Sequence, residues 1–304
     1  MIKIESVTKK LDDYVALSGL TCIIPKGSIY GLIGSNGAGK STLLRAITGV
    51  YNIDCGNITL EDEKVFENPA AKIKMMYVPD ELYFLHGANM MRMATMYADI
   101  YTNFDMERFN ELTQIFKLDP KVNIAKLSKG MKRQVAIILA LSTRADYLFF
   151  DETFDGLDPV KRNLVRNLIA QDSHDFGTTV IITSHSLREL EDTCDQLALL
   201  HNGGIVFESD VQNLKTSLFK VQIAYLHQYD KEQFENLEVL DFSKHGSVAN
   251  LIIRGDRDDT FNILNATNPA LLEILPLSLE EVFIHEMQSV GYSFSAIVGG
   301  EDDV

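Results

Sequence analysis

Short apolar runs alternate with helix-like segments between residues 145 and 208. Three runs, YLFFDE, TTVIITSH and QLALLHNG, begin at Tyr147, Thr178 and Gln196. The stretches 159–172 and 186–195, which separate them, are predicted to be helices. Apolar runs without polar alternation are typical of strands covered on both faces, as in a parallel sheet. The alternation of strand and helix therefore predicts an α/β fold with a mainly parallel core sheet.

The beginning of the chain predicts strands, then a glycine-rich turn, then a helix. Residues 28–34 (SIYGLIG) form an apolar run that ends in glycine. Leu43, Leu44 and Ile47 follow with helical spacing. Strand, glycine loop and helix thus succeed one another directly, which is the arrangement that many phosphate-binding sites use.

Residues 87–142 are predicted to be mostly helical. Phe109, Leu112, Ile115 and Phe116 recur at intervals of three or four residues, and Asp105 is placed to cap that helix at its N-terminus. Methionines gather in the same region, where they are more typical of core packing than of a special surface. We expect a helical subdomain here.

A second, smaller domain is predicted after a boundary near residues 213–217. The segments FKVQIAY and VANLIIRG read as strands, and residues 231–237 and 259–266 read as helices. Asn202-Gly203-Gly204, just before the boundary, marks a hairpin. We therefore predict a first domain over residues 1–214, a small α+β domain over residues 215–290, and a disordered acidic tail over residues 291–304.

Composition narrows the choice of partners and compartment. The chain has 304 residues, of which 43 are acidic and 28 are basic, giving a formal net charge of −15. This charge makes nucleic acid an unfavourable partner, because phosphate backbones require basic patches. Three cysteines without a C-x-x-C pair favour a reducing cytosol over a disulfide framework. We find neither a secretory signal nor an apolar run long enough to span a membrane.

The most specific motif is G-S-N-G-A-G-K-S at residues 34–41, a full match to the phosphate-binding pattern G-x-x-x-x-G-K-[ST]. Glycines let the backbone wrap a polyphosphate, and its amides then point inward as an anion-binding nest. Lys40 would contact the β- and γ-phosphates, and the Ser41 hydroxyl would bind Mg²⁺. The motif predicts phosphate binding by Gly34, Ser35, Asn36, Gly37, Ala38, Gly39, Lys40 and Ser41.

Two carboxylates end the apolar strand that begins at Tyr147. Ligand sites of open parallel sheets lie at the carboxyl ends of the strands, so Asp151 and Glu152 should lie near the phosphate loop. We expect Asp151 to hold Mg²⁺, through water, and Glu152 to polarise the attacking water. A hydrophobic strand followed by an acid is common without function, but the loop at 34–41 in the same chain favours the catalytic interpretation.

Three further motifs make the pattern specific. Leu127-Ser128-Lys129-Gly130-Met131 precedes the acidic strand, Asp155-Gly156-Leu157-Asp158 follows it, and Thr183-Ser184-His185 closes the next strand. In this order the set resembles the nucleotide-binding subunit of ABC transporters, over about Ile2–Glu208. Residues 278–287 (SLEEVFIHEM) resemble, less specifically, the tail of exporter-type subunits.

The resemblance implies a fold and a set of roles. The fold would be a P-loop ATPase cassette with a mainly parallel core sheet, an antiparallel N-terminal β part and a helical subdomain, plus the C-terminal appendage. Ser128, Lys129 and Gly130 would form a signature that covers the ATP of an opposite subunit. The ATP-binding residues would be those of the phosphate loop, extended to Thr42, together with Tyr14. Asp158 would lie in the loop linking the two sites. Glu152, His185 and Lys40 would be the catalytic residues, with His185 contacting the γ-phosphate.

Three features depart from the family pattern. Lys129 and Met131 replace a glycine and a glutamine, although the Ser128 hydroxyl and the helix start are retained. Asp80 stands where the family has a glutamine, and an acid there would still bind Mg²⁺, at altered affinity or rate. The aromatic that stacks on adenine is displaced to Tyr14, which either stacks on the base or simply packs.

These observations predict an ATP-hydrolysing subunit of an ABC transporter, of exporter type, with ATP and Mg²⁺ as cofactors. The implied partners are a membrane subunit, docked on residues 82–101, and a second ATPase subunit in a homodimer or heterodimer. The chain would lie in the cytoplasm, peripheral to the inner face of the membrane. The alternatives are a soluble regulatory ATPase that is not coupled to transport and an ABC-type ATPase of DNA repair or translation. The chain has a single cassette and no sustained heptad repeats, which disfavours an ATPase of DNA repair or translation.

Overall fold

The chain forms two compact units in the computed structural model, which describes residues 1–289. Contacts divide the chain between Glu208 and Ser209. The first unit is built on two sheets and the second on one, and each unit has its own hydrophobic core. The predicted acidic tail at residues 291–304 lies outside the described residues.

A six-stranded sheet forms the centre of the first unit. Its strand order is β10-β9-β3-β8-β7-β6, and the pairs from β9 to β6 are parallel. The strands are β3 (Ile29–Ile33), β6 (Met75–Val78), β7 (Tyr147–Asp151), β8 (Thr179–Ser184), β9 (Gln196–His201) and β10 (Gly204–Asp210). Every residue of β3, β7 and β8 is buried. Burial on both faces explains their continuous apolar sequences and confirms the predicted parallel core.

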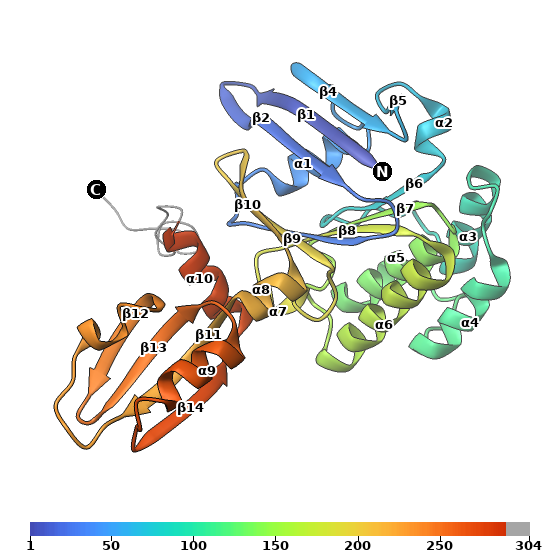
Figure 1. Ribbon diagram of the computed structural model, residues 1–304. Coiled ribbons are helices and arrows are strands. Elements are labelled where there is room, and N and C mark those ends of the chain that lie inside the picture. The colour runs from blue at the N-terminus through green and yellow to red at the C-terminus, as the bar shows by residue number, and fades with distance from the viewer. Residues whose placement is uncertain (290–304) are drawn as a thin grey trace. The chain divides into compact units, whose positions relative to one another are not determined.

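An antiparallel sheet of order β2-β1-β4-β5 lies over one face of this core. Its strands are β1 (Ile2–Leu11), β2 (Tyr14–Ile24), β4 (Cys55–Leu60) and β5 (Glu63–Lys64). Helix α1 (Lys40–Ile47) contacts β2, β4 and β7, and so lies between the two sheets (Figure 1). Its buried side chains, Leu43, Leu44 and Ile47 among them, join both sheets in one core.

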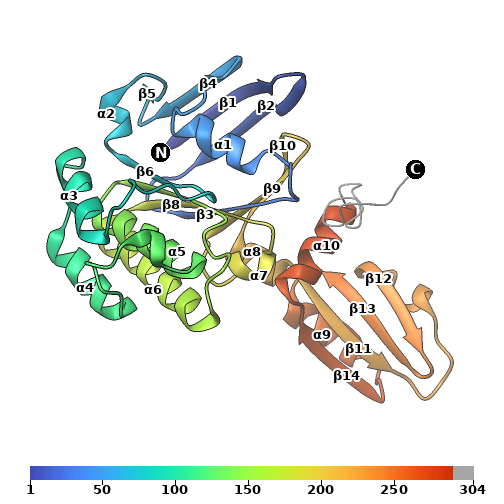
Figure 2. The ribbon, with the colours of Figure 1, turned by 180° about the vertical axis from the view of Figure 1, so that it is seen from behind.

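The remaining helices of the first unit gather mainly on the other face of the parallel sheet (Figure 2). Asp105 caps α4 by accepting a hydrogen bond from the amide of Arg108, as its sequence position predicts. Residues 87–142 are helical, as predicted, with loops between the helices. The helices are α2 (Pro69–Lys72), α3 (Met90–Ile100), α4 (Met106–Phe116), the 3₁₀ helix η1 (Ile124–Lys126), α5 (Lys129–Ser142), α6 (Pro159–Phe176) and α7 (Leu187–Leu190).

The second unit is an antiparallel sheet with helices, which confirms the α+β prediction. Its strand order, β12-β13-β11-β14, is that of a split βαβ arrangement. Phe219, Val221 and Leu251 face a core that includes Leu264 of α9, while Arg254 on the other face pairs with Glu286 of α10. The elements are α8 (Val211–Ser217), β11 (Leu218–Ala224), the 3₁₀ helix η2 (Lys231–Phe234), β12 (Glu238–His245), β13 (Val248–Arg254), α9 (Arg257–Asn265), β14 (Leu271–Pro276) and α10 (Leu279–Ser289).

Some predicted boundaries were wrong. The helix predicted over residues 186–195 is a single turn, α7, followed by hydrogen-bonded turns in which the amides of Thr193 and Cys194 both donate to the carbonyl of Leu190. Strands β12 and β14 were missed. Within residues 1–289, the helices are all too short or too polar to cross a membrane.

Candidate functional site

The loop between β3 and α1 has a backbone that only glycine accommodates. Gly39 has φ +111°, and a Cβ there would lie 2.6 Å from the carbonyl oxygen of Ala16. A Cβ on Gly34 would lie 2.5 Å from the carbonyl oxygen of Leu200. Gly39 caps α1 without a side-chain hydrogen bond, so the amides of the first helical turn face the loop. A nest of amides at a helix N-terminus fits a polyphosphate.

The ammonium group of Lys40 lies inside this loop. Its Nζ donates to the carbonyl oxygens of Gly34 at 2.7 Å and Ser35 at 3.2 Å. The same nitrogen forms an ion pair with Glu152 Oε1 at 3.1 Å. The side chain is 6% exposed, so its positive charge lies inside the loop, close to the backbone amides.

Ser41 and Asp151 are joined as a hydroxyl–carboxylate pair. The Ser41 Oγ donates to Asp151 Oδ1 at 3.0 Å, and Asp151 is fully buried. Asp151 is in register with Thr183 on β8, whose hydroxyl also donates to Oδ1, at 2.7 Å. On the other side, the Tyr77 hydroxyl donates to Oδ2 at 3.0 Å. Oxygen donors of this kind suit Mg²⁺, and these residues fit the ion that the sequence implies.

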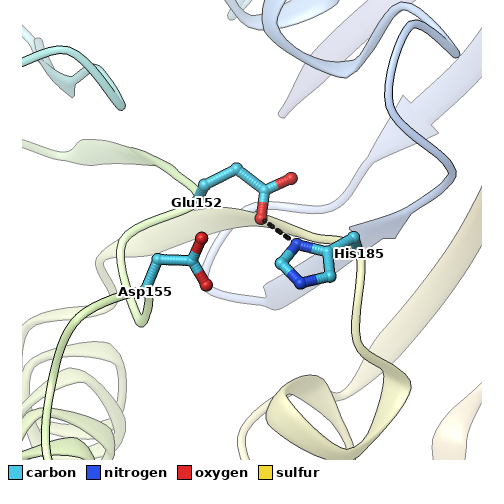
Figure 3. Close-up of side chains that lie close together, drawn as sticks. All are labelled: Glu152, Asp155 and His185. Atoms are coloured by element: carbon cyan, nitrogen blue, oxygen red, sulfur yellow. Dashed lines mark hydrogen bonds and ion pairs between the residues drawn. The ribbon is translucent and has the colours of Figure 1, made fainter.

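Glu152 follows Asp151 in a left-handed backbone conformation, with φ +46°. Its amide donates to the hydroxyl of Thr183 at 3.0 Å. Its Oε2 lies 3.0 Å from Nδ1 of His185, as Figure 3 shows. With Oε1 on Lys40, the Glu152 carboxylate bridges the phosphate loop and the histidine that follows β8.

Asp155 lies beside this pair. Figure 3 shows Asp155, Glu152 and His185 with their polar atoms near one another, and one ligand atom of each lies within 4.8 Å of the other two. The sequence motifs predicted no role for the Asp155 side chain itself. Two carboxylates and an imidazole at this separation are chemically able to hold a divalent cation as well as a water molecule.

The predicted signature and the loop after Glu152 lie in contact. Ser128 caps α5 and accepts a hydrogen bond from the amide of Met131 at 3.2 Å, and Lys129 is the first helical residue. A Cβ on Gly130 would lie 2.7 Å from the carbonyl oxygen of Gly156. Asp158 caps α6 through the amide of Lys161. Contact with a second subunit stays a prediction for these residues.

Tyr14 lies against the phosphate loop. Its hydroxyl donates to the carbonyl oxygen of Gly37 at 3.1 Å, and the residue is 55% exposed. The side chain is therefore not packed in the core. Stacking of its ring on a base stays a prediction.

Asp80 is held by an arginine from α5. Arg133 Nη2 lies 2.7 Å from Asp80 Oδ1, and Arg133 Nη1 donates to the carbonyl oxygen of Pro79 at 3.0 Å. The ion pair gives this carboxylate a structural function that the sequence did not indicate. The described contacts do not join Asp80 to Ser41 or Asp151, and its role as a Mg²⁺ ligand stays a prediction.

Sequence reasoning missed Tyr77 and Arg133 and assigned no role to Thr183. A tyrosine in the strand before Pro79 has no periodicity or spacing that sets it apart from core residues. Thr183 had one usable signal: a polar residue at the carboxyl end of an apolar strand next to the acidic strand.

Comparison with known proteins identifies the family. Residues 17–155 match the family model described as ABC transporter. The chain is 29% identical over 287 residues to the ABC transporter ATP-binding protein YtrB of Bacillus subtilis, covering 93% of this chain and 97% of that one. It is 30% identical to the uncharacterized ABC transporter ATP-binding protein YhaQ of the same species, covering 77% and 79%. It is 35% identical to the methionine import ATP-binding protein MetN of Protochlamydia amoebophila, covering 66% and 61%.

Solved structures show the same fold. A dimeric ATP-binding cassette in a post-hydrolysis state, bound to ADP and phosphate, superposes with a TM-score of 0.63 at 20% identity, covering 69% of this chain and 99% of that one. Proteins of this family hydrolyse ATP, and the phosphate loop with its hydroxyl–carboxylate pair fits ATP and Mg²⁺. The chain therefore belongs to the ATP-binding proteins of the ABC transporter family and is an ATPase with ATP and Mg²⁺ as its cofactors.

Proposed function

We propose that this ATPase couples the ATP-driven closure of a dimer to transport through a separate membrane subunit, with export as the direction. The position of the Glu152 carboxylate carries the proposal. It lies between Lys40 in the phosphate loop and His185, at 3.1 and 3.0 Å. A general base must lie within hydrogen-bond reach of the proton that it accepts, and this carboxylate lies beside the loop that would hold the phosphates.

Each residue of the site has a defined task in this proposal. Lys40 and the loop amides bind the β- and γ-phosphates. Ser41 and Asp151 would hold Mg²⁺, and that ion would supply positive charge opposite the charge that develops on the phosphate oxygens. Glu152 accepts a proton as the water oxygen bonds to phosphorus and the bond to the leaving ADP breaks. His185 contacts the γ-phosphate and orients Glu152.

A second subunit would complete the site. Ser128, Lys129 and Gly130 of one subunit would cover the ATP bound to Lys40 of the other. The similar cassette that forms a dimer with ADP and phosphate supports this arrangement. Because the covering residues act only when nucleotide is present, dimer affinity should depend on ATP.

The membrane subunit would dock on residues 82–101. Large apolar side chains are exposed there: Tyr83 at 82%, Ile100 at 52% and Met91 at 37%. Exposed apolar groups that cluster on one segment are typical of interaction sites. Docking would place the chain at the cytoplasmic, inner face of the membrane, as a peripheral subunit.

Export is supported by residues 278–287, which resemble exporter tails and lie largely in α10 of the second unit. One relative, MetN, is named as an import protein, so direction requires its own measurement. In inside-out vesicles, an exporter takes substrate up when ATP is supplied outside, whereas an importer does not.

The coupling is tested by reconstitution. The chain should co-purify with a multi-span membrane protein encoded beside it, and vesicles holding both should hydrolyse ATP faster than the chain alone. Unchanged hydrolysis, with no transport in either vesicle orientation, would support the alternative of a regulatory ATPase that is not coupled to transport.

A further inference from the structure

The buried carboxylate of Asp151 is held by three hydroxyl groups. Ser41 and Thr183 both donate to Oδ1, at 3.0 and 2.7 Å. Tyr77 donates to Oδ2, at 3.0 Å. A buried charge requires hydrogen-bond partners on both oxygens, so the orientation of this carboxylate depends on Tyr77 from one side and on the other two hydroxyls from the opposite side.

The direction of the Tyr77–Asp151 hydrogen bond follows from its two partners. A carboxylate oxygen without a proton can only accept, so the Tyr77 hydroxyl donates to Asp151 Oδ2. Arg45, which donates to the Tyr51 hydroxyl at 3.1 Å, also interacts with the phenol of Tyr77.

We propose that Tyr77 is a positioning residue for the magnesium site, acting through its hydrogen bond to Asp151. This inference rests on the proposed role of Asp151 in holding the metal. Without the tyrosine hydroxyl, Oδ2 would lack its partner in a buried environment and the carboxylate would rotate away from the position that it shares with Ser41. Partners of metal-binding carboxylates commonly alter metal affinity tenfold or more when they are removed.

Tyr147 provides a matched control. It is fully buried, begins the neighbouring strand β7, and its hydroxyl contacts Glu61 at 3.2 Å, in a different hydrogen-bond group. Tyr147→Phe and Tyr77→Phe therefore remove the same hydroxyl group from adjacent strands, from a fully buried ring in β7 and from a half-buried one in β6. If the Tyr77 hydroxyl only stabilises the fold, the two variants should show the same Mg²⁺ dependence of nucleotide binding.

The experiment measures binding of a fluorescent ATP analogue to the full chain over a series of Mg²⁺ concentrations, with EDTA as the zero point. For Tyr77→Phe we expect unchanged affinity in EDTA and about a tenfold rise in the Mg²⁺ concentration that gives half of the metal-dependent tightening. Tyr147→Phe should match the wild type. An unshifted Mg²⁺ dependence in Tyr77→Phe would overturn the inference.

Asp151→Asn, measured in parallel, separates this inference from the role of Asp151 itself. A shift in Asp151→Asn without one in Tyr77→Phe refutes only the positioning role, whereas no shift in either refutes the metal role of Asp151. If Tyr77→Phe does not fold, Arg45→Met removes the group behind the phenol. It should shift the Mg²⁺ dependence in the same direction, and its failure to do so would count against the inference.

Discussion

Arg133 of α5 and Asp80 of the loop after β6 form an ion pair of 2.7 Å that joins the signature helix to the edge of the parallel sheet. The arginine side chain is 1% exposed, whereas that of the aspartate is 51% exposed. The buried partner therefore depends on the exposed one for charge compensation. The aspartate that departs from the family pattern acts here as a link between the core and the helical subdomain.

Removing that link should destabilise the protein. Asp80→Ala would leave the buried guanidinium of Arg133 without a carboxylate, at an expected cost of about 2 kcal/mol in the free energy of unfolding. Urea denaturation measures this cost. Asp62→Asn, which neutralises an exposed acid paired with Lys3 and suits the positive φ of that residue, should change stability much less, because exposed ion pairs contribute little. If Asp80→Ala instead keeps full stability and needs more Mg²⁺ for hydrolysis, Asp80 is a Mg²⁺ ligand and not a structural partner of Arg133.

Lys40→Ala should abolish nucleotide binding at ordinary concentrations. The substitution removes a charge-assisted contact to the phosphates, and we expect ATP affinity to fall by about 100-fold. Equilibrium binding of a labelled nucleotide measures the effect, with Lys3→Ala as a surface control. If Lys40→Ala hydrolysed ATP at the wild-type rate, residues 34–41 would not be the phosphate loop.

Glu152→Gln should separate binding from chemistry. The amide keeps the shape of the side chain but no longer accepts a proton, so turnover should fall by about 10² to 10⁴ while ATP still binds. In the presence of ATP the variant should also run as a larger species on gel filtration, because the closed dimer would persist. Glu63→Gln, on the short strand β5, is the control. Wild-type turnover in Glu152→Gln would mean that another residue is the base.

Gly130→Ala should displace the loop at residues 155–158. The added methyl group would lie 2.7 Å from the carbonyl oxygen of Gly156, a contact that backbone must move to relieve, at a cost of about 1–3 kcal/mol. Gly204→Ala meets its nearest atom only at 3.9 Å and should be tolerated. The comparison is made by thermal unfolding, and equal melting temperatures would contradict the predicted contact.

Glu61 should make stability depend on acid pH. Hydrogen bonds from Lys74 and then Lys26 lower the pKa of Glu61 from 4.5 to about 2. A lowered folded-state pKa stabilises the protein above the unfolded pKa, and this stabilisation is lost as the pH falls from about 4.5 towards 2. For so exposed an ion-pair group we expect about 1 kcal/mol. Denaturation near pH 7 and near pH 2 should show a difference between wild type and Glu61→Gln only at the higher pH, and Asp62→Asn serves as the control.

The sequence was sufficient where a residue type is required by local geometry. The phosphate loop needs glycine at Gly34 and Gly39 because side chains would collide with Leu200 and Ala16, and so the motif located both the loop and the start of α1. The parallel strands were equally visible, because burial on both faces leaves no polar alternation.

The sequence was insufficient where partners come from distant elements. Tyr77 lies 74 residues from Asp151, and Arg133 lies 53 residues from Asp80. Such pairs depend on the sheet order and on helix placement, which no local pattern encodes. Strand β12 was missed because, as an edge strand with partly exposed residues on both faces, it lacks a regular apolar repeat.

The left-handed backbone of Glu152 sets the stability of the fold against catalysis at this residue. An L-residue with φ +46° costs roughly 1–2 kcal/mol relative to an ordinary conformation, and glycine would relieve most of that penalty. Glycine has no carboxylate, however. Selection for stability and selection for ATP turnover therefore favour different residues at this position. A chain that no longer needed hydrolysis would become more stable if glycine replaced Glu152.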